Sequence, residues 1–335
     1  MSIVTSLSLC TRITMDMHNL NSEGTEGNQQ QTRMVHIIDQ QGQRAVVNAI
    51  SGDMFKHILV EHLIPLLESG GQPVSPGAHI HDADRINSDP QFVDFCEKEQ
   101  EFVTNGKKEP RKATEAEIMR RILQQCSVTD VAGTLVTRGR AVGRKSVVEF
   151  GWVVGLPTDG QGQMLTTTEQ YFHVKYAPEG RGGAAGGETV AGKQAIFHRP
   201  ASSGIYALIC NLDLYRIGLN DITRVYDVDK DHRVKRAKAT VEALAATLLK
   251  PVGAQRNTQN PHLVACEGMV AVSCNSLPAP TVSPLHDNYK EQATELAGVL
   301  NGIQANAITV HSFDTFATGA KVLVDISGDL DLPGA

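Results

Sequence analysis

The sequence predicts an α/β (α+β) protein whose central elements follow the order β-α-β-β-α-β. Apolar residues alternate with polar ones in several short runs, which is the period of a half-buried strand. Two longer segments carry apolar residues at helical spacing, and the strongest elements occur in the order of a ferredoxin-like or RRM-like sheet. The chain has 335 residues, 41% of them hydrophobic, so it is long enough for about two domains and at least one large core.

The first half of this core contains two strands and one helix. Apolar and polar residues alternate over Ser6–Asp16, which predicts a half-buried strand. A polar loop rich in Gly and Asn follows, and a second, short strand is expected over Met34–Ile38. Ser51 precedes apolar residues at helical spacing, so it is a suitable N-cap for the first helix.

The second half begins after a less regular region. Residues 70–105 show no clear period and are expected to be irregular, whereas Thr114 and Glu117 form a capping box that opens a helix. The remaining elements are strand-like runs over 146–155 and 166–176, a buried strand over Gly204–Tyr215, a helix over Val234–Leu249 and a strand over His262–Ser273.

The segment Glu179–Arg199 is the least structured part of the chain. It holds six glycines among 21 residues and cannot form a core, so it predicts a flexible loop. Residues 187–194 match the G-x-x-x-x-G-K pattern of a phosphate loop, but Gln194 stands where Ser or Thr would hold magnesium. A phosphate loop also opens a helix, whereas Pro200 and a strand follow here. We therefore interpret this segment as a flexible loop.

Charge is sorted along the chain. The formal net charge of −6 argues against a purely electrostatic nucleic-acid binder. Between Lys107 and Lys145, however, 10 Lys and Arg residues stand against 4 Asp and Glu, a net of +6, which leaves 21 basic and 33 acidic residues elsewhere. Arg138, Arg140, Arg144 and Lys145 lie among glycines without an acidic residue, which suits contact with a phosphate backbone. A solvated basic surface is the alternative.

The six cysteines are far apart and form no C-x-x-C pair, so we expect reduced, mostly buried thiols. The N-terminus has neither the charged nor the apolar region of a signal peptide. No window approaches the roughly 18 uncharged apolar residues that a membrane-spanning helix needs. We expect a cytoplasmic protein with no membrane partner, and no motif requires a cofactor.

One short segment is the best enzymatic lead. His79, His81, Asp82 and Asp84 place two imidazoles and two carboxylates within six residues, which are ligands suited to zinc or manganese. A metal-dependent hydrolase built on them is therefore one alternative function. A solvated polar loop without a metal is the other interpretation of these residues.

Segments in three parts of the chain together resemble one family, the backbone subunit of type I CRISPR surveillance (Cascade) complexes, in its DevR autoregulator-type branch. NAISGDMFKH at Asn48–His57 and NLNSEGTEGNQ at Asn19–Gln29 look like its first-helix region. SSGIYALICNLDL at Ser202–Leu214 is similar to the strand after its thumb, and GAQRNTQNPHLVA at Gly253–Ala265 to its RNA-facing loop. The order of these segments also agrees with the family, whose core is a modified RRM.

The resemblance implies a non-catalytic protein that polymerises head to tail along a CRISPR guide RNA (crRNA), beside other Cascade subunits. The guide would stay free to pair with target DNA. In the thumb, Ile196 and Phe197 would wedge against a displaced base. Together with the basic stripe, the candidate RNA-binding residues are Asn19, Asn21, Asn48, Ser51, Lys56, His57, Arg138, Arg140, Arg144, Lys145, Lys193, Arg199, Gln255 and Arg256.

The same resemblance divides the chain into three parts. Residues 1–69 and 200–335 would form an RRM-like palm with a C-terminal extension, residues 70–178 an inserted finger region, and residues 179–199 a flexible thumb hairpin. The family's autoregulator label also keeps a DNA-binding regulator as an alternative. Such a regulator needs an element that reads duplex DNA, and the sequence shows no convincing helix-turn-helix.

Overall fold

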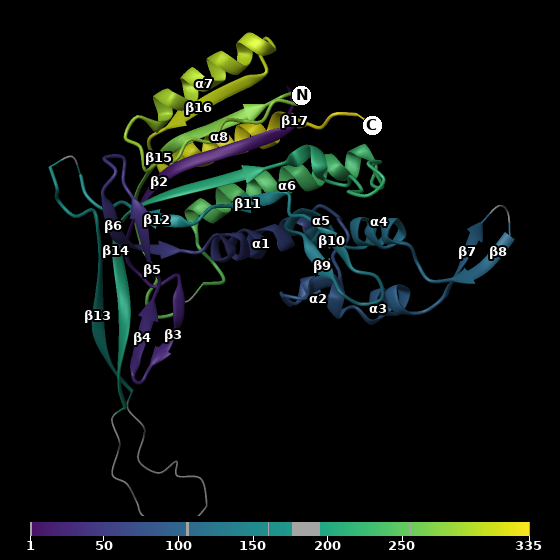
Figure 1. Ribbon diagram of the computed structural model, residues 1–335, viewed down its shortest axis with the longest axis horizontal. Helices are drawn as coiled ribbons and strands as arrows, with labels where there is room; N and C mark the ends of the chain where they lie inside the picture. Colours follow the sequence, from purple (N-terminus) through teal and green to yellow (C-terminus); the bar gives the residue numbers. More distant parts are fainter. Residues whose placement is uncertain (1, 105–106, 160, 176–194, 255, 335) are drawn as a thin grey trace, which may run out of the picture.

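The computed structural model describes residues 2–104, 107–159, 161–175, 195–254 and 256–334 (Figure 1). A large sheet forms its centre, and the strands along the main path of this sheet pair antiparallel. In spatial order they are β16 (Ile308–Phe313), β15 (His262–Ser273), β2 (Ser6–His18), β14 (Ala195–Leu212), β12 (Val153–Gly155), β6 (Arg44–Ile50) and β5 (Met34–Ile38). The expected mixed α/β class is confirmed.

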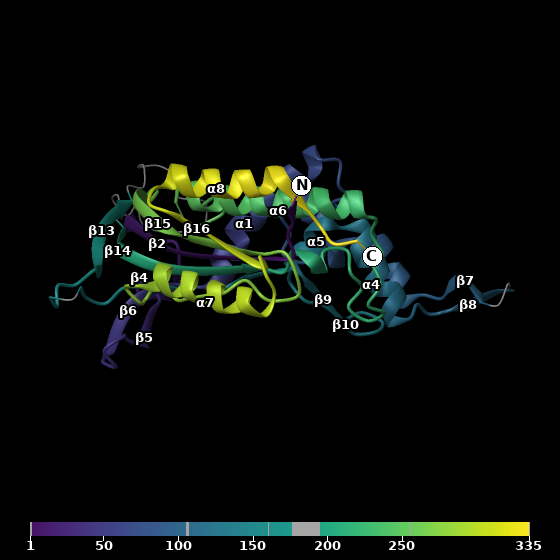
Figure 2. The same ribbon diagram turned by 90° about the horizontal axis from the view of Figure 1, so that it is seen from above.

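Helices cover both faces of the sheet (Figure 2). On one face lie α1 (Gly52–Ser69), α6 (Lys230–Leu249) and α8 (Phe316–Asp329), and on the other lies α7 (Tyr289–Ile303). Because side chains alternate along a strand, β2 serves both layers. Leu7 and Leu9 belong to the main core with α1 and α6, while Cys10 packs with Tyr289 in a smaller core under α7.

Most elements expected for the core are present. They occur along the chain as β2, α1, β11 (Val148–Phe150) with β12, then β14, α6 and β15. The short strand over Met34–Ile38 is β5, which pairs with β6. Thr114 caps α4 (Glu115–Gln125), and both hydrogen bonds of its capping box with Glu117 form.

The expectation of an irregular region at 70–105 is wrong. It contains α2 (Pro76–His79), the 3₁₀ helix η1 (Arg85–Ser88), α3 (Pro90–Glu97) and β7 (Gln100–Thr104). Helices α2 and α3 each begin with Pro after a capping residue, Ser75 or Asp89, which accepts a backbone hydrogen bond. Proline fits the first helical position because its missing N–H would be unpaired there, so the pairs Ser75-Pro76 and Asp89-Pro90 were readable start signals.

Further elements extend the fold beyond this core. The hairpin of β7 and β8 (Lys107–Arg111) projects from one end of the molecule, beyond α3 and α4 (Figure 1). The remaining elements are β1 (Ser2–Ile3), β3 (Ser22–Glu26), β4 (Gln29–Thr32), α5 (Ser127–Ala132), β9 (Thr134–Val136), β10 (Val142–Arg144), β13 (Thr166–Lys175), η2 (Leu214–Arg216) and β17 (Leu330–Asp331).

A long hairpin flanks the predicted flexible segment. Strand β13 pairs with the first part of β14, from Thr166 opposite Gly204 to Lys175 opposite Ala195, and this hairpin projects away from the rest of the main sheet, in which the second part of β14 lies (Figure 1). The expectation that flexibility extends to Arg199 is therefore wrong, because residues 195–199 belong to β14. Residues 176–194, which include the phosphate-loop-like motif, lie outside the described residues. That motif is followed by a strand and not by a helix.

Candidate nucleic-acid interface

The N-terminus of α1 is capped and presented next to β11. Ser51 is extended, and its hydroxyl accepts a hydrogen bond from the backbone N–H of Met54. Gly52 lies so close to β11 that a Cβ atom there would collide with the carbonyl oxygen of Phe150. The first turn of α1 is thus held against the sheet, with a helix N-terminus that favours a negative charge.

Three asparagines predicted to contact RNA are buried, and one of them supports this helix end directly. Asn21 Oδ1 accepts a hydrogen bond from the backbone N–H of Ser51 at 3.0 Å, and Asn48 Nδ2 donates to the carbonyl of Arg33 at 3.0 Å. The hydroxyl of Tyr206 donates to Asn48 Oδ1. Asn19 Nδ2 instead lies within hydrogen-bond distance of Gln30 and Gln259. Because all three asparagines are buried, their assignment as RNA contacts is corrected to a structural role inside the fold.

Two cations lie together one turn further along α1. Lys56 is half-buried, and burial followed by the nearby charge of Arg85 lowers the pKa of its ammonium group. Arg85 comes from η1, donates from Nη1 to the carbonyl of Gly133 at 2.7 Å, and has its own pKa lowered by burial. The carboxylates of Asp53, in the first turn of α1, and of Glu149 act in the opposite direction and partly offset this repulsion, and an external anion would offset it further. The sequence interpretation missed Arg85, because only the turn that begins with Asp82 brings it back to α1.

The loop before β15 meets α1 and the start of β14. Gly253 has a φ of 79°, and a Cβ there would lie 2.7 Å from His57 Nε2, so glycine permits the close approach of this loop to α1. Arg199 donates from Nη1 to the Thr258 hydroxyl at 2.8 Å, and Arg256 approaches Asn260 Oδ1. Ser51, Lys56 and His57 thus lie at the start of α1. Arg256 belongs to the loop whose Gly253 approaches this helix, and Arg199 contacts the same loop, whereas Lys193 and Gln255 lie outside the described residues.

The basic stripe does not form one surface. Arg144 is buried, and its guanidinium donates to Asp130 Oδ1 at 2.7 Å and to Asp221 Oδ2 at 2.9 Å. It cannot reach a phosphate, so its assignment as an RNA contact is wrong. The physical reason is that acidic residues distant in sequence compensate its charge inside the fold.

The other members of the stripe are exposed but lie elsewhere. Arg138 and Arg140 occupy the turn between β9 and β10. These two strands lie near α4 and α5, on the side of the molecule away from the β13–β14 hairpin (Figure 1). Arg138 lies 4.0 Å from Glu97. Lys145 follows β10 and is also exposed, beside a shallow pocket that contains Glu149 and Asp213. These three cations remain accessible at a separate surface.

The candidate metal-binding residues diverge. His79 Nδ1 contacts Glu68, and His81 Nδ1 contacts Glu61 Oε1 at 2.8 Å, so each imidazole faces a different carboxylate of α1. Asp82 Oδ1 accepts a hydrogen bond from the backbone N–H of Asp84. Within the described ranges, no group of three or more His, Cys, Asp or Glu side chains is placed to hold a metal ion. The hydrolase alternative gains no support from this geometry.

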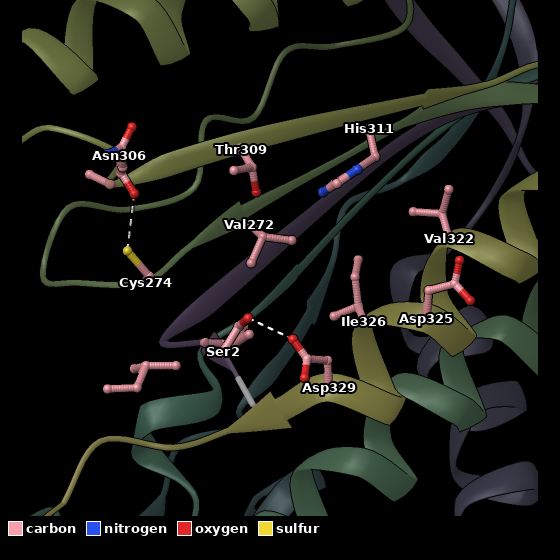
Figure 3. A pocket seen from close by; sticks show the side chains of 13 residues that line it. Ser2, Val272, Cys274, Asn306, Thr309, His311, Val322, Asp325, Ile326 and Asp329 are labelled. Atoms are coloured by element: carbon pink, nitrogen blue, oxygen red, sulfur yellow. Dashed lines mark hydrogen bonds between the residues drawn. The ribbon is translucent and has the colours of Figure 1, made fainter.

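A cavity of ≈ 540 Å³ lies away from this interface, between β15, β16 and α8 (Figure 3). Its wall is mainly apolar. The thiol of Cys274 donates a hydrogen bond to the carbonyl of Asn306 at one end of the cavity. Thr309 and Val272 separate this thiol from His311 (Figure 3).

The cysteines match their expected state. Cys274 is exposed, the other five are buried and all six are free, so the prediction of mostly buried thiols is confirmed. The described helices include none long and apolar enough to cross a membrane.

The fold and this site define a class: a mixed α/β protein with Lys56 and Arg85 near a capped helix N-terminus, beside the carboxylates of Asp53 and Glu149. The chain belongs to the family described as "CRISPR-associated negative auto-regulator DevR/Csa2", whose model matches residues 9–294. This match confirms the resemblance found in the sequence. A comparison with curated proteins found no match.

Several solved structures are distantly similar. A chain described as "CRISPR RNA-guided surveillance complex, pre-nicking" has 11% identity and a TM-score of 0.47, covering 96% of this chain and 100% of that chain. Another, described as "CRISPR RNA-guided surveillance complex", has 11% identity and a TM-score of 0.47, covering 97% and 99%. The crystal structure of Thermofilum pendens Csc2 has 13% identity and a TM-score of 0.38, covering 96% and 80%.

Proposed function

We propose that this protein is a crRNA-binding backbone subunit of a type I CRISPR surveillance complex. It would polymerise along the guide and leave the bases free to pair with target DNA. Its membership of the DevR/Csa2 family supports this proposal. The observation that carries it is the grouping of Lys56 and Arg85 beside the capped N-terminus of α1, with the Arg256 loop packed against the same helix.

These groups suit a sugar–phosphate backbone. A helix N-terminus, a half-buried ammonium and guanidinium groups all favour phosphate, and none of them reads a base edge. They are donors and cations rather than a nucleophile with a base, so the proposed role is binding and not catalysis. In this proposal the core is a modified RRM, residues 70–178 are the finger region, and the β13–β14 hairpin is the base of the thumb.

The hairpin adds aromatic surface to this interface. Phe172 is 74% exposed and its ring lies 4.5 Å from that of His198, while Phe197 stacks on His173 at 5.5 Å. Such rings can contact unstacked bases of a single strand. Ile196 and Phe197, which are proposed to wedge against a displaced base, belong to β14, and His198 is an aromatic side chain on the same strand.

Salt dependence of RNA affinity tests the proposal. Lys56→Gln and Arg256→Gln should each weaken binding of a single-stranded RNA and reduce the log–log salt slope by about 0.7. Lys321→Gln removes the same charge from an exposed position on α8 and should change neither quantity. A double variant with wild-type affinity and slope would refute the interface, and preferential binding of duplex DNA would favour the DNA-binding regulator.

Assembly is tested separately. A head-to-tail contact between unlike surfaces gives an open filament whose length the RNA template sets. Light scattering should therefore show long particles with RNA and monomers or short oligomers after nuclease treatment. One closed ring that persists without RNA would contradict polymerisation along the guide.

A further inference from the structure

Trp152 is the only tryptophan of the chain and is 47% exposed. It follows β11 and directly precedes β12, in which Val153 pairs with Ile50 of β6. Continuing this antiparallel register by one residue puts Trp152 opposite Ser51, the N-cap of α1. The exposed indole thus lies beside the helix end that heads the proposed RNA interface.

A cation covers part of this ring. The guanidinium carbon of Arg33 lies 4.8 Å from the centroid of the Trp152 ring, which is the geometry of a cation–π pair. The backbone of Arg33 is fixed, because its carbonyl accepts from the N–H of Ala49 and from Asn48 Nδ2, both at 3.0 Å. Arg33 directly precedes β5 and Trp152 directly precedes β12, and these two strands flank β6, whose end leads into Ser51.

The backbone around Trp152 is equally constrained. The N–H of Gly151 donates to the carbonyl of Ile209 at 3.1 Å, and Gly52 packs directly against Phe150 and Gly151. Rigid aromatic side chains lose little conformational entropy when they stack, and the fixed backbone reduces this loss further. An exposed ring on a fixed backbone can stack against a planar group at a low cost in conformational entropy.

We propose that Trp152, backed by Arg33, is a stacking platform for one nucleobase of a single-stranded nucleic acid whose phosphate lies at the N-terminus of α1. This inference rests on the proposed function and adds a base contact to an interface otherwise made of phosphate contacts. Stacking is tolerant of sequence because every base has a π face. A nucleobase is favoured over a protein side chain because its strand carries phosphates, and Lys56 and Arg85 offer two cations near this helix end, alongside the carboxylates of Asp53 and Glu149.

Because the chain contains a single tryptophan, its fluorescence reports this site alone. Titration with a single-stranded RNA of about 10 nucleotides should quench the fluorescence, with the same midpoint as fluorescence anisotropy of the labelled RNA. An abasic ribose–phosphate strand of equal length carries the same charge without bases. It should bind more weakly and leave the fluorescence unchanged, and this arm requires no protein variant.

Variants separate stacking from charge. Trp152→Ala should weaken RNA binding about 5- to 150-fold while the salt slope stays unchanged, because no charge is removed. Trp152→Phe should recover part of the affinity. Val299→Ala shortens an exposed apolar side chain on α7, 67% exposed, and should bind like the wild type.

Three outcomes overturn the inference in different ways. RNA that binds by anisotropy without quenching, and with wild-type affinity for Trp152→Ala, refutes the platform and leaves the proposed function standing. Absence of RNA binding refutes both. A change of fluorescence with protein concentration alone, without RNA, assigns Trp152 to a contact between copies of the chain and also refutes the platform.

Discussion

Replacing Asp130 by Asn would remove a negative charge from the protein interior where α5, β10 and α6 meet. Arg144 Nη2 lies 2.7 Å from Asp130 Oδ1, and Arg236 Nη1 lies 2.8 Å from Oδ2, with all three side chains at most 2% exposed. The carboxylate also accepts the backbone N–H of Gly218. The substitution leaves two buried guanidinium groups without their shared counter-charge.

The expected loss is about 3–5 kcal/mol of unfolding free energy, because removing one partner of a buried pair leaves an uncompensated charge. Arg144 keeps its ion pair with Asp221, so the uncompensated charge is mainly that of Arg236. This is a large part of the roughly 5–15 kcal/mol that stabilises a typical domain. Asp325→Asn is the matched control. Lys321 Nζ also lies 2.7 Å from Asp325 Oδ2, but these side chains are 72% and 61% exposed, so its loss should not exceed about 1 kcal/mol.

Urea unfolding of both variants measures the difference. The Arg144–Asp130 and Lys321–Asp325 pairs have equal lengths, so burial and the additional partners of Asp130 separate the expected effects. Arg144→Met should likewise lower the unfolding midpoint and, in the folded state, keep the wild-type salt slope of RNA binding. Equal midpoints for Asp130→Asn and Asp325→Asn would refute the argument, and a reduced salt slope for Arg144→Met would return Arg144 to the RNA interface.

Three further predictions concern stability. Burial lowers the pKa of His18 to about 4. The contribution of neutral His18 to the free energy of unfolding is therefore fully present above about pH 6.5, and up to about 3 kcal/mol of it is lost as the pH drops towards 4. His18→Gln should flatten this pH dependence of stability in urea titrations. Hydrogen bonds from Arg111 lower the pKa of Glu117 to about 2. The ionised carboxylate therefore contributes less than about 1 kcal/mol to the free energy of unfolding, a contribution that is present above pH 4.5 and lost towards pH 2. Glu117→Gln should abolish this pH-dependent contribution. Ser51→Ala should cost about 1 kcal/mol in thermal unfolding and Ser51→Asp much less.

Elements with a strong period or a cap were predictable from the sequence. Alternation over residues 6–16 gave β2, and Ser51 gave the start of α1, because side-chain period and capping are local properties. The helices at 76–79 and 90–97 are short, so their apolar spacing was too brief to recognise. The only sequence signal for these two helices was the proline that follows the capping residue Ser75 or Asp89.

The candidate site was predictable only in part. Motifs at residues 48–57 and 253–265 identified two segments that pack together, since Gly253 lies against His57. Their buried asparagines were indistinguishable in sequence from exposed ones. Arg85 and Trp152 were missed, because a cation and a ring acquire their positions from sheet register and from a turn with positive φ at Arg85, which local composition does not encode.

The basic stripe shows why a charge count fails as a map of an interface. Arg144 contributes to the net +6 of residues 107–145, yet Asp130 and Asp221 compensate it inside the fold. Lys56 and Arg85 stand 29 positions apart in sequence, and neither belongs to the stripe. What distinguishes them is that the fold places both cations near a helix N-terminus. Burial and then the charge of Arg85 lower the pKa of Lys56, while the carboxylates of Asp53 and Glu149 only partly offset this shift. A phosphate-binding surface in this protein is therefore better sought where like charges are forced together than where they are numerous.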